Sequence, residues 1–120
     1  MDPILQKLLH FRKERNWEQF HSPRNIAQSI VLESAEILEI FQWKVDDSIT
    51  KKDRRRLAEE IADVYNWLIL LSHDLNINLQ EEALKKIEIN RKKYPVEKSK
   101  GTARKYTQLW LSTKQLKSNF

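Results

Sequence analysis

The sequence predicts an all-α fold in a chain of single-domain size. Its 120 residues include one glycine and three prolines, too few turn-forming residues for a β-sandwich or barrel. Apolar residues make up 40% of the chain, and over several long segments they recur with the 3.6-residue spacing of an amphipathic helix. A short polar side chain of the kind that caps helix N-termini precedes each of these segments. We therefore expect a bundle of four main helices.

Local signals mark where each helix begins and ends. At each predicted helix start, a capping side chain is followed by a proline or by an acidic residue three positions later. They are Asp2-Pro3, Ser22-Pro23, Thr50 with Asp53, and Asn78 with Glu81. The predicted helices run to about residues 15, 44, 75 and 94, and Tyr94-Pro95 stops the last one. We assign residues 1–95 to a helical domain and 96–120 to a basic arm, with a linker over 96–104 and a short helix or extended arm over 106–116.

Several classes of protein are excluded by composition. The chain has no cysteine, which excludes a disulfide scaffold, a thiol nucleophile and a cysteine-ligated metal centre. The N-terminal residues form no apolar signal segment, and no apolar run approaches the ~18 residues of a membrane span. We expect a cytoplasmic protein with no membrane partner.

Charge is unevenly distributed along the chain. Residues 1–83 carry 11 Lys and Arg against 15 Asp and Glu, whereas residues 84–120 carry 11 against 2. A uniformly basic surface would indicate nucleic-acid binding. An acidic region followed by a basic one equally suits a divalent metal and a phosphorylated small molecule.

Two paired carboxylates are the central feature of the sequence. Glu33 and Glu36 lie in the second predicted helix, and Glu60 and Asp63 in the third. Each pair has a spacing of three, so its members share one helix face beside the apolar stripe. Four carboxylates meeting at a packed face would repel one another unless a cation lay among them. Magnesium, which prefers oxygen ligands, is the predicted ion. A di-iron centre is disfavoured because neither helix carries the Glu-x-x-His motif of such sites.

Aromatic and cationic residues supply a predicted nucleotide site around these carboxylates. Trp43 lies two helical turns beyond Glu36, and Trp17, Phe20 and His21 lie in the turn before the second helix. Such rings can stack on a base, although each is equally typical of an ordinary core. Further along, Lys86, Asn90 and Lys93 share one face of the fourth helix, and Arg104 and Lys105 follow in the arm. These groups are candidates for binding phosphate oxygens.

On these residues the sequence resembles the MazG-like all-α nucleoside triphosphate pyrophosphohydrolases, most closely the dCTP pyrophosphatase branch. The similarity runs from about Phe11 to Tyr106. It includes the Glu-x-x-Glu and Glu-x-x-Asp pairs, and the segments 14–21, 41–44 and 89–95, which read ERNWEQFH, FQWK and INRKKYP. The sequence departs from that branch at Leu8, where a pocket histidine is expected, and at Trp67, where tyrosine is expected.

The resemblance implies a function. Glu33, Glu36, Glu60 and Asp63 would bind Mg²⁺, and Glu33 or Glu36 would activate the attacking water. The base would be bound by Trp17, His21 and Trp43, and the phosphates by Lys86, Asn90 and the cations of the arm, Arg104 and Lys105. We expect Trp67 and Lys93 to bind substrate as well. The reaction would convert dCTP, or a 5-modified dCTP, to dCMP and pyrophosphate, cleansing the nucleotide pool. The family also implies a homodimer or homotetramer.

Two alternatives remain open at this stage. A helical nucleic-acid-binding module would use the basic second part of the chain but would not need a carboxylate cluster. A non-catalytic structural oligomer would treat the four acids as surface residues. We expect no nucleic-acid partner, because the acidic pairs lie beside apolar residues.

Overall fold

The structure, a computed structural model, describes residues 2–105, 107 and 108, and these are helical or irregular, with no β-strand among them. The chain divides into two compact units between Leu79 and Gln80. Each unit is described by itself. Within the described residues, no helix combines the length and the apolar character needed to cross a bilayer.

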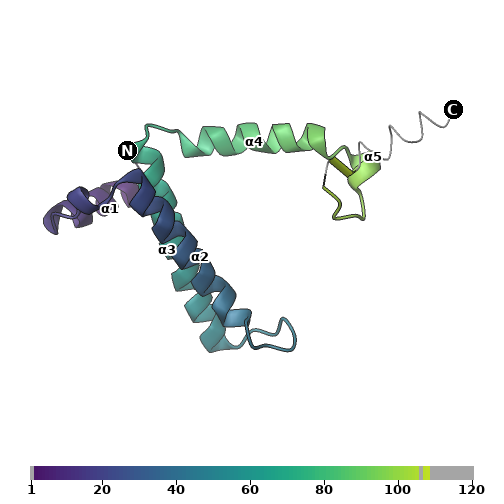
Figure 1. The fold of residues 1–120 in the computed structure, drawn as a ribbon, viewed down its shortest axis with the longest axis horizontal. Helices are drawn as coiled ribbons and strands as arrows, with labels where there is room; N and C mark the ends of the chain where they lie inside the picture. Colours follow the sequence, from purple (N-terminus) through teal and green to yellow (C-terminus); the bar gives the residue numbers. More distant parts are fainter. Residues whose placement is uncertain (1, 106, 109–120) are drawn as a thin grey trace. The chain divides into compact units, whose positions relative to one another are not determined.

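The first unit consists of three α-helices and one short 3₁₀ helix. They are α1 (Pro3–Glu14), η1 (Glu18–Phe20), α2 (Pro23–Phe41) and α3 (Lys51–Asp74). The long helices α2 and α3 form an antiparallel hairpin, and α1 packs against α3 (Figure 1). The all-helical class is as predicted. The hairpin aligns the two carboxylate-bearing helices side by side.

The predicted helix starts in this unit are confirmed. Asp2 accepts a hydrogen bond from the amide of Ile4 at 2.8 Å, and Ser22 accepts one from the amide of Asn25 at 3.2 Å. At the start of α3, Thr50 and Asp53 form the reciprocal capping box, with distances of 3.1 and 3.2 Å. These side chains satisfy amides that have no partner within the helix.

Two asparagines end α1 and α3 in the same way. Asn16 and Asn76 have φ angles of 55° and 56°, a left-handed conformation that asparagine tolerates better than most residues. In each case the next amide reaches back five residues, from Trp17 to the carbonyl of Arg12 and from Ile77 to that of Ser72. The turn after α1 therefore reverses the chain sharply and fixes the start of the Trp17–His21 segment.

The connection between α2 and α3 is closed by an ion pair. The ammonium of Lys44 lies 2.6 Å from the carboxylate of Asp53, and this hydrogen bond lowers the pKa of Asp53 to about 2. The α2 helix ends at Phe41, two to three residues earlier than predicted, because Gln42 and Lys44 form tighter turns to the carbonyls three residues before them.

The second unit contains α4 (Leu79–Lys93), apart from its first residue, and α5 (Val96–Ser99). The fourth predicted helix is thus present and ends, as expected, before Pro95. The short helix α5, which the sequence analysis did not predict, lies at the start of the segment 96–104 that was predicted as a basic linker. Its single turn forms because the amides of Lys98 and Ser99 donate hydrogen bonds to the carbonyl of Pro95. A helix of one turn is too short to show the apolar spacing by which longer helices are predicted from sequence. The predicted segment 106–116 lies almost entirely outside the described residues.

Little of the apolar surface is buried within one chain. The buried apolar residues among those described are Ile26, Ile40 and Leu70. Large apolar side chains are exposed on both hairpin helices, including Val31, Leu38 and Ile61. Exposed apolar area of this kind is typical of a surface that another protein chain covers.

Candidate metal and nucleotide site

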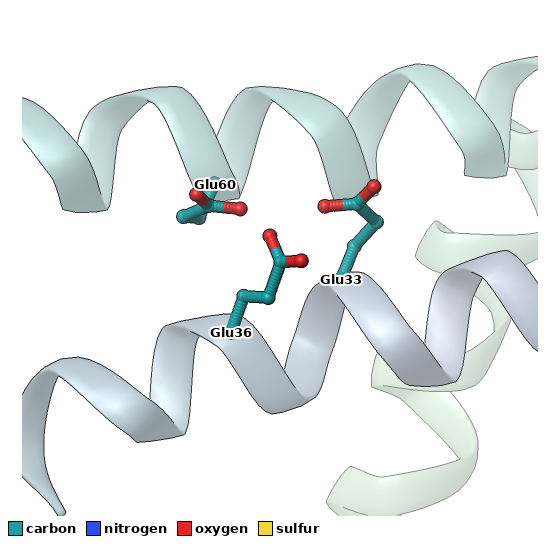
Figure 2. Close-up of side chains that lie close together, drawn as sticks. All are labelled: Glu33, Glu36 and Glu60. Atoms are coloured by element: carbon teal, nitrogen blue, oxygen red, sulfur yellow. The ribbon is translucent and has the colours of Figure 1, made fainter.

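Three carboxylates meet between the two helices of the hairpin. Glu33 and Glu36 project from α2 toward α3, and Glu60 projects from α3 into the space between the two helices (Figure 2). One carboxylate oxygen from each lies within 4.8 Å of the others. The spacing of three along α2 puts both of its glutamates on the face that α3 covers. The antiparallel pairing predicted from the short connection brings Glu60 opposite them.

Their mutual repulsion shows in their acidity. A hydrogen bond with Glu36, partial burial and the charges of neighbouring carboxylates raise the pKa of Glu60 from 4.5 to about 7. Burial, followed by the charge of Glu36, raises the pKa of Glu33. The Oε2 atom of Glu60 is buried and has no hydrogen-bond partner among the described residues. A cation at this point would relieve the repulsion and supply the partner that this oxygen lacks.

The fourth predicted carboxylate, Asp63, lies beside this cluster. It is not one of the three that approach within 4.8 Å, but its charge contributes to the raised pKa of both Glu33 and Glu60. It also lines a pocket together with Glu33. The structure thus brings three of the four acids together and places the fourth, Asp63, among the residues that line the adjoining pocket.

Aromatic rings from three segments line the same pocket. Trp17 and His21, which flank η1, have ring centroids 6.2 Å apart. His21 meets Trp67 of α3 edge-on at 5.1 Å, and Trp17 meets Phe11 of α1 edge-on at 5.7 Å. Offset and edge-to-face contacts are the favoured arrangements of aromatic pairs. The sequence predicted Trp17, His21 and Trp67 as site residues, and the fold does bring them together.

The pocket has a volume of about 530 Å³, within the usual range for small-molecule sites. Its wall combines residues from α1, α2, α3 and the η1 region: Ile4, Lys7, Leu8, Phe11, Arg12, Trp17, His21, Glu33, Asp63, Asn66, Trp67 and Leu70. Carboxylates and aromatic rings therefore line the same pocket. A ligand with a metal-binding group and a flat ring would find a partner for each.

An ion pair that the sequence analysis missed joins α1 to α3 at this pocket. The guanidinium of Arg12 donates two hydrogen bonds to the carboxylate of Asp74, at 2.8 and 3.0 Å. These bonds raise the pKa of Arg12, and the residue is 8% exposed. The available signal was its position: Arg12 follows Ile4 and Leu8 at a spacing of four, so a charged residue occupies the apolar face of α1.

Trp43 does not join the other aromatic residues. It follows the end of α2, is 87% exposed, and is not among the described residues that line the pocket. Trp67 lies at the opposite end of the hairpin from Trp43, as the antiparallel arrangement of α2 and α3 requires. The two tryptophans cannot enclose one base within a single chain.

The predicted phosphate-binding residues lie in the second unit. Lys86, Asn90 and Lys93 belong to α4 and share one face because their spacing is four and three. Lys86 and Asn90 are exposed, and Lys93 is half-buried. Arg104 and Lys105 are exposed and follow α5.

Several known proteins are similar to this chain in sequence or in fold. The MazG-like family matches residues 28–109. The chain is 40% identical over 117 residues to dCTP pyrophosphatase 1 of Mus musculus and 38% identical to that of Homo sapiens; each match covers 90% of this chain and 69% of the relative. A solved pyrophosphatase from Archaeoglobus fulgidus is similar with a TM-score of 0.73 and 40% identity, over 77% of this chain and 89% of that one.

These similarities confirm the resemblance that the sequence motifs indicated. The family match includes the four acids and all of α3, and the similarity to the relatives extends over nearly the whole chain. The chain belongs to the MazG-like family.

Proposed function

We propose that this protein is a magnesium-dependent nucleoside triphosphate pyrophosphohydrolase that converts dCTP, or a 5-modified dCTP, to dCMP and pyrophosphate in the cytoplasmic nucleotide pool. One observation carries the proposal: a single pocket is lined both by two carboxylates, Glu33 and Asp63, and by the rings of Trp17, His21 and Trp67. The names of the relatives, dCTP pyrophosphatase 1 and a pyrophosphatase, support the same reaction.

Glu33, Glu36 and Glu60 would hold the metal, with Asp63 as a further ligand. Their fit to Mg²⁺ rests on the donor set, which is entirely carboxylate oxygen, and on the unpartnered Oε2 of Glu60. When bound, Mg²⁺ supplies charge neutralisation for phosphate oxygens and a lower pKa for water. Glu33 or Glu36 would orient the attacking water and accept its proton.

The aromatic residues would hold the base. Trp17 and Trp67 both line the pocket, and the ring of each lies near that of His21. Stacking of a base on an aromatic ring is worth about 1–3 kcal/mol. Burial is the largest influence that lowers the pKa of His21, so its ring is neutral at pH 7 and suits an uncharged base.

The phosphates would be bound by the second unit. Lys86, Asn90 and Lys93 on α4, with Arg104 and Lys105 beyond α5, supply the cations that a triphosphate requires and that the first-unit pocket largely lacks. In this proposal residues 1–95 form the helical domain, and residues 96–120 form the basic arm.

The active form would be a homodimer or a homotetramer. Exposed Val31, Leu38 and Ile61 on the hairpin support burial against a second copy. Trp43, distant from the pocket of its own chain, would reach the base in the pocket of a partner. The shared site would then make a monomer inactive.

The proposal is tested by incubating the full chain with each common nucleoside triphosphate and Mg²⁺, and by measuring pyrophosphate and phosphate separately. We expect pyrophosphate release that is greatest with dCTP or a 5-modified dCTP. Release of phosphate alone would contradict the pyrophosphohydrolase assignment. Absence of turnover together with salt-sensitive DNA binding would favour the nucleic-acid-binding alternative.

A further inference from the structure

Arg12 presents a hydrogen-bond donor that the fold itself does not use. Its two terminal nitrogens are occupied by Asp74, but its Nε is buried and has no hydrogen-bond partner among residues 2–105, 107 and 108. Buried N–H groups without a partner are rare and costly, at about 1–3 kcal/mol each. Because Arg12 lines the pocket, we expect its Nε–H to find its hydrogen-bond acceptor on the ligand that the pocket binds.

The surroundings of Arg12 show what kind of ligand atom would meet it. Arg12 lines the pocket together with Trp17, His21 and Trp67. Its charge contributes to lowering the pKa of His21, as expected for neighbouring groups. The Nδ1 atom of His21 is also buried and lacks a partner among the described residues. Two unpaired polar atoms thus occupy the aromatic region of the pocket.

The ion pair with Asp74 makes Arg12 unsuitable as a phosphate ligand. The carboxylate neutralises the guanidinium and occupies the paired donors that would grip an anion. Of the guanidinium's five N–H groups, the two ion-pair bonds use one on each terminal nitrogen, and Nε–H is the one whose nitrogen is buried without a partner. It can donate a hydrogen bond but cannot accept one. The matching ligand atom is an uncharged acceptor, such as a ring nitrogen or a carbonyl oxygen on the edge of a pyrimidine.

We propose that Arg12 is a specificity-determining residue whose Nε–H donates a hydrogen bond to an acceptor on the edge of the bound base. This inference rests on the proposed function, because it takes the base to occupy the aromatic region. Asp74 is then a positioning residue, which holds the guanidinium so that Nε faces the ligand. A site built to donate to an acceptor discriminates strongly against a base that lacks it.

The test separates this role from the role of the ion pair in folding. Arg12→Lys keeps a cation for Asp74 but removes Nε–H, whereas Asp74→Asn keeps Nε–H but weakens the ion pair. For each protein, the binding of dCMP is compared with that of two analogues, one lacking the ring nitrogen acceptor and one lacking the carbonyl oxygen. Binding is measured by titration calorimetry without metal, so that no hydrolysis intervenes.

We expect one analogue to bind wild-type protein about tenfold more weakly than dCMP does. Asp74→Asn should show a smaller penalty for the same analogue, because its guanidinium is held less firmly. In Arg12→Lys, dCMP and that analogue should bind within about twofold of each other. With dCTP and Mg²⁺, Arg12→Lys should raise KM about tenfold and leave kcat within a few-fold. Equal penalties in wild type and Arg12→Lys, or no penalty for either analogue in wild type, would overturn the proposal.

Two further measurements keep the outcomes distinct. If circular dichroism shows that Arg12→Lys is unfolded, the exchanged pair Arg12→Asp with Asp74→Arg replaces it, because this variant retains an ion pair but also lacks Nε–H on α1. Pyrophosphate release by wild-type protein is measured on the same preparation. Turnover without analogue discrimination would refute only the role of Arg12, whereas discrimination without turnover would refute only the proposed function.

Discussion

A carboxylate oxygen of Glu36 on α2 lies within 4.8 Å of one on Glu60 of α3 (Figure 2). This contact between residues 24 positions apart follows from the antiparallel hairpin, which is closed by the Thr50–Asp53 capping box and the Lys44–Asp53 ion pair. A hydrogen bond with Glu36, followed by burial and the charges of neighbouring carboxylates, raises the pKa of Glu60 to about 7. The arrangement is therefore costly to the fold and suited to binding a cation.

Replacing either acid of this pair by its amide should abolish turnover while keeping the fold. In Glu36→Gln and Glu60→Gln, a neutral amide preserves the shape, removes a metal-binding charge and relieves repulsion. Loss of an indirect metal partner costs about 10–100-fold in activity, so we expect a loss of at least about 100-fold for these proposed ligands, with an unchanged or higher melting temperature. Pyrophosphate release and calorimetry measure the two effects.

Glu39→Gln is the matched control, since Glu39 is an exposed acid on α2 outside the cluster. It should retain activity within about twofold. A rate near that of wild type in Glu36→Gln or Glu60→Gln at saturating Mg²⁺ would remove that residue from the set of ligands.

Metal-free protein should lose stability as the pH rises from about 4.5 to about 7. In this window the folded state holds a proton on Glu60, with its raised pKa, that the unfolded chain has released at its ordinary value of 4.5. Since the folded state binds more protons, its free energy of unfolding falls with rising pH and levels off above about pH 7. Denaturant titrations in EDTA across pH 4–8 measure this dependence.

Glu60→Gln cannot release this proton, so its stability should change much less over the same range. Added Mg²⁺ should raise the melting temperature of wild-type protein more at pH 8 than at pH 5, because deprotonated carboxylates bind the ion. An identical pH dependence in wild type and Glu60→Gln would show that another group is responsible.

Removing an aromatic ring from the pocket should weaken substrate binding without altering the products. Trp17→Ala should raise KM for dCTP about tenfold, in line with a stacking contribution of about 1–3 kcal/mol. Trp43→Ala should also raise KM if Trp43 enters the pocket of a partner, yet should change the melting temperature little, because the ring is 87% exposed in its own chain. Steady-state kinetics with dCTP and with inorganic tripolyphosphate separate binding of the base from binding of the phosphates. If a tryptophan variant lost activity equally on dCTP and on tripolyphosphate, the replaced ring would have a structural role and would not bind the base.

Charges on the exposed apolar face of α2 should dissociate the assembly. Val31 and Leu38 lie seven residues apart on one helix face and are each 68% exposed. In the double variant Val31→Glu with Leu38→Glu, burial of unpaired carboxylates would oppose association. Light scattering should then give a mass near the chain's 14.4 kDa, with activity lost in parallel.

Val45→Glu is the control, because Val45 is a fully exposed residue in the connection between α2 and α3 and lies off this face. It should leave mass and activity unchanged. Full activity in a monomeric double variant would refute the shared site.

The elements that sequence predicted best are those determined by neighbours in the chain. Capping residues such as Asp2 and Thr50 act within one turn, and the spacing of Glu33 and Glu36 determines their common face without any tertiary contact. The meeting with Glu60 was predictable because the connection between α2 and α3 is short enough to require an antiparallel pair.

What sequence did not reveal depends on contacts between distant segments. Arg12 pairs with Asp74 across 62 positions, and neither residue alone differs from an ordinary surface charge except that Arg12 interrupts an apolar face. The helix α5 was missed for the opposite reason. Its one turn is stabilised by the carbonyl of Pro95 and has no apolar period.

The most direct test of the two-part pocket is a crystal structure of the wild-type protein with Mn²⁺ and a non-hydrolysable dCTP analogue, with the metal located by anomalous scattering. Mn²⁺ is suitable because carboxylate sites for Mg²⁺ also accept it. The account predicts a metal bound by oxygens of Glu33, Glu36 and Glu60, and the cytosine ring between Trp17 and Trp67. A metal bound elsewhere, or a base lying outside this pocket, would contradict it.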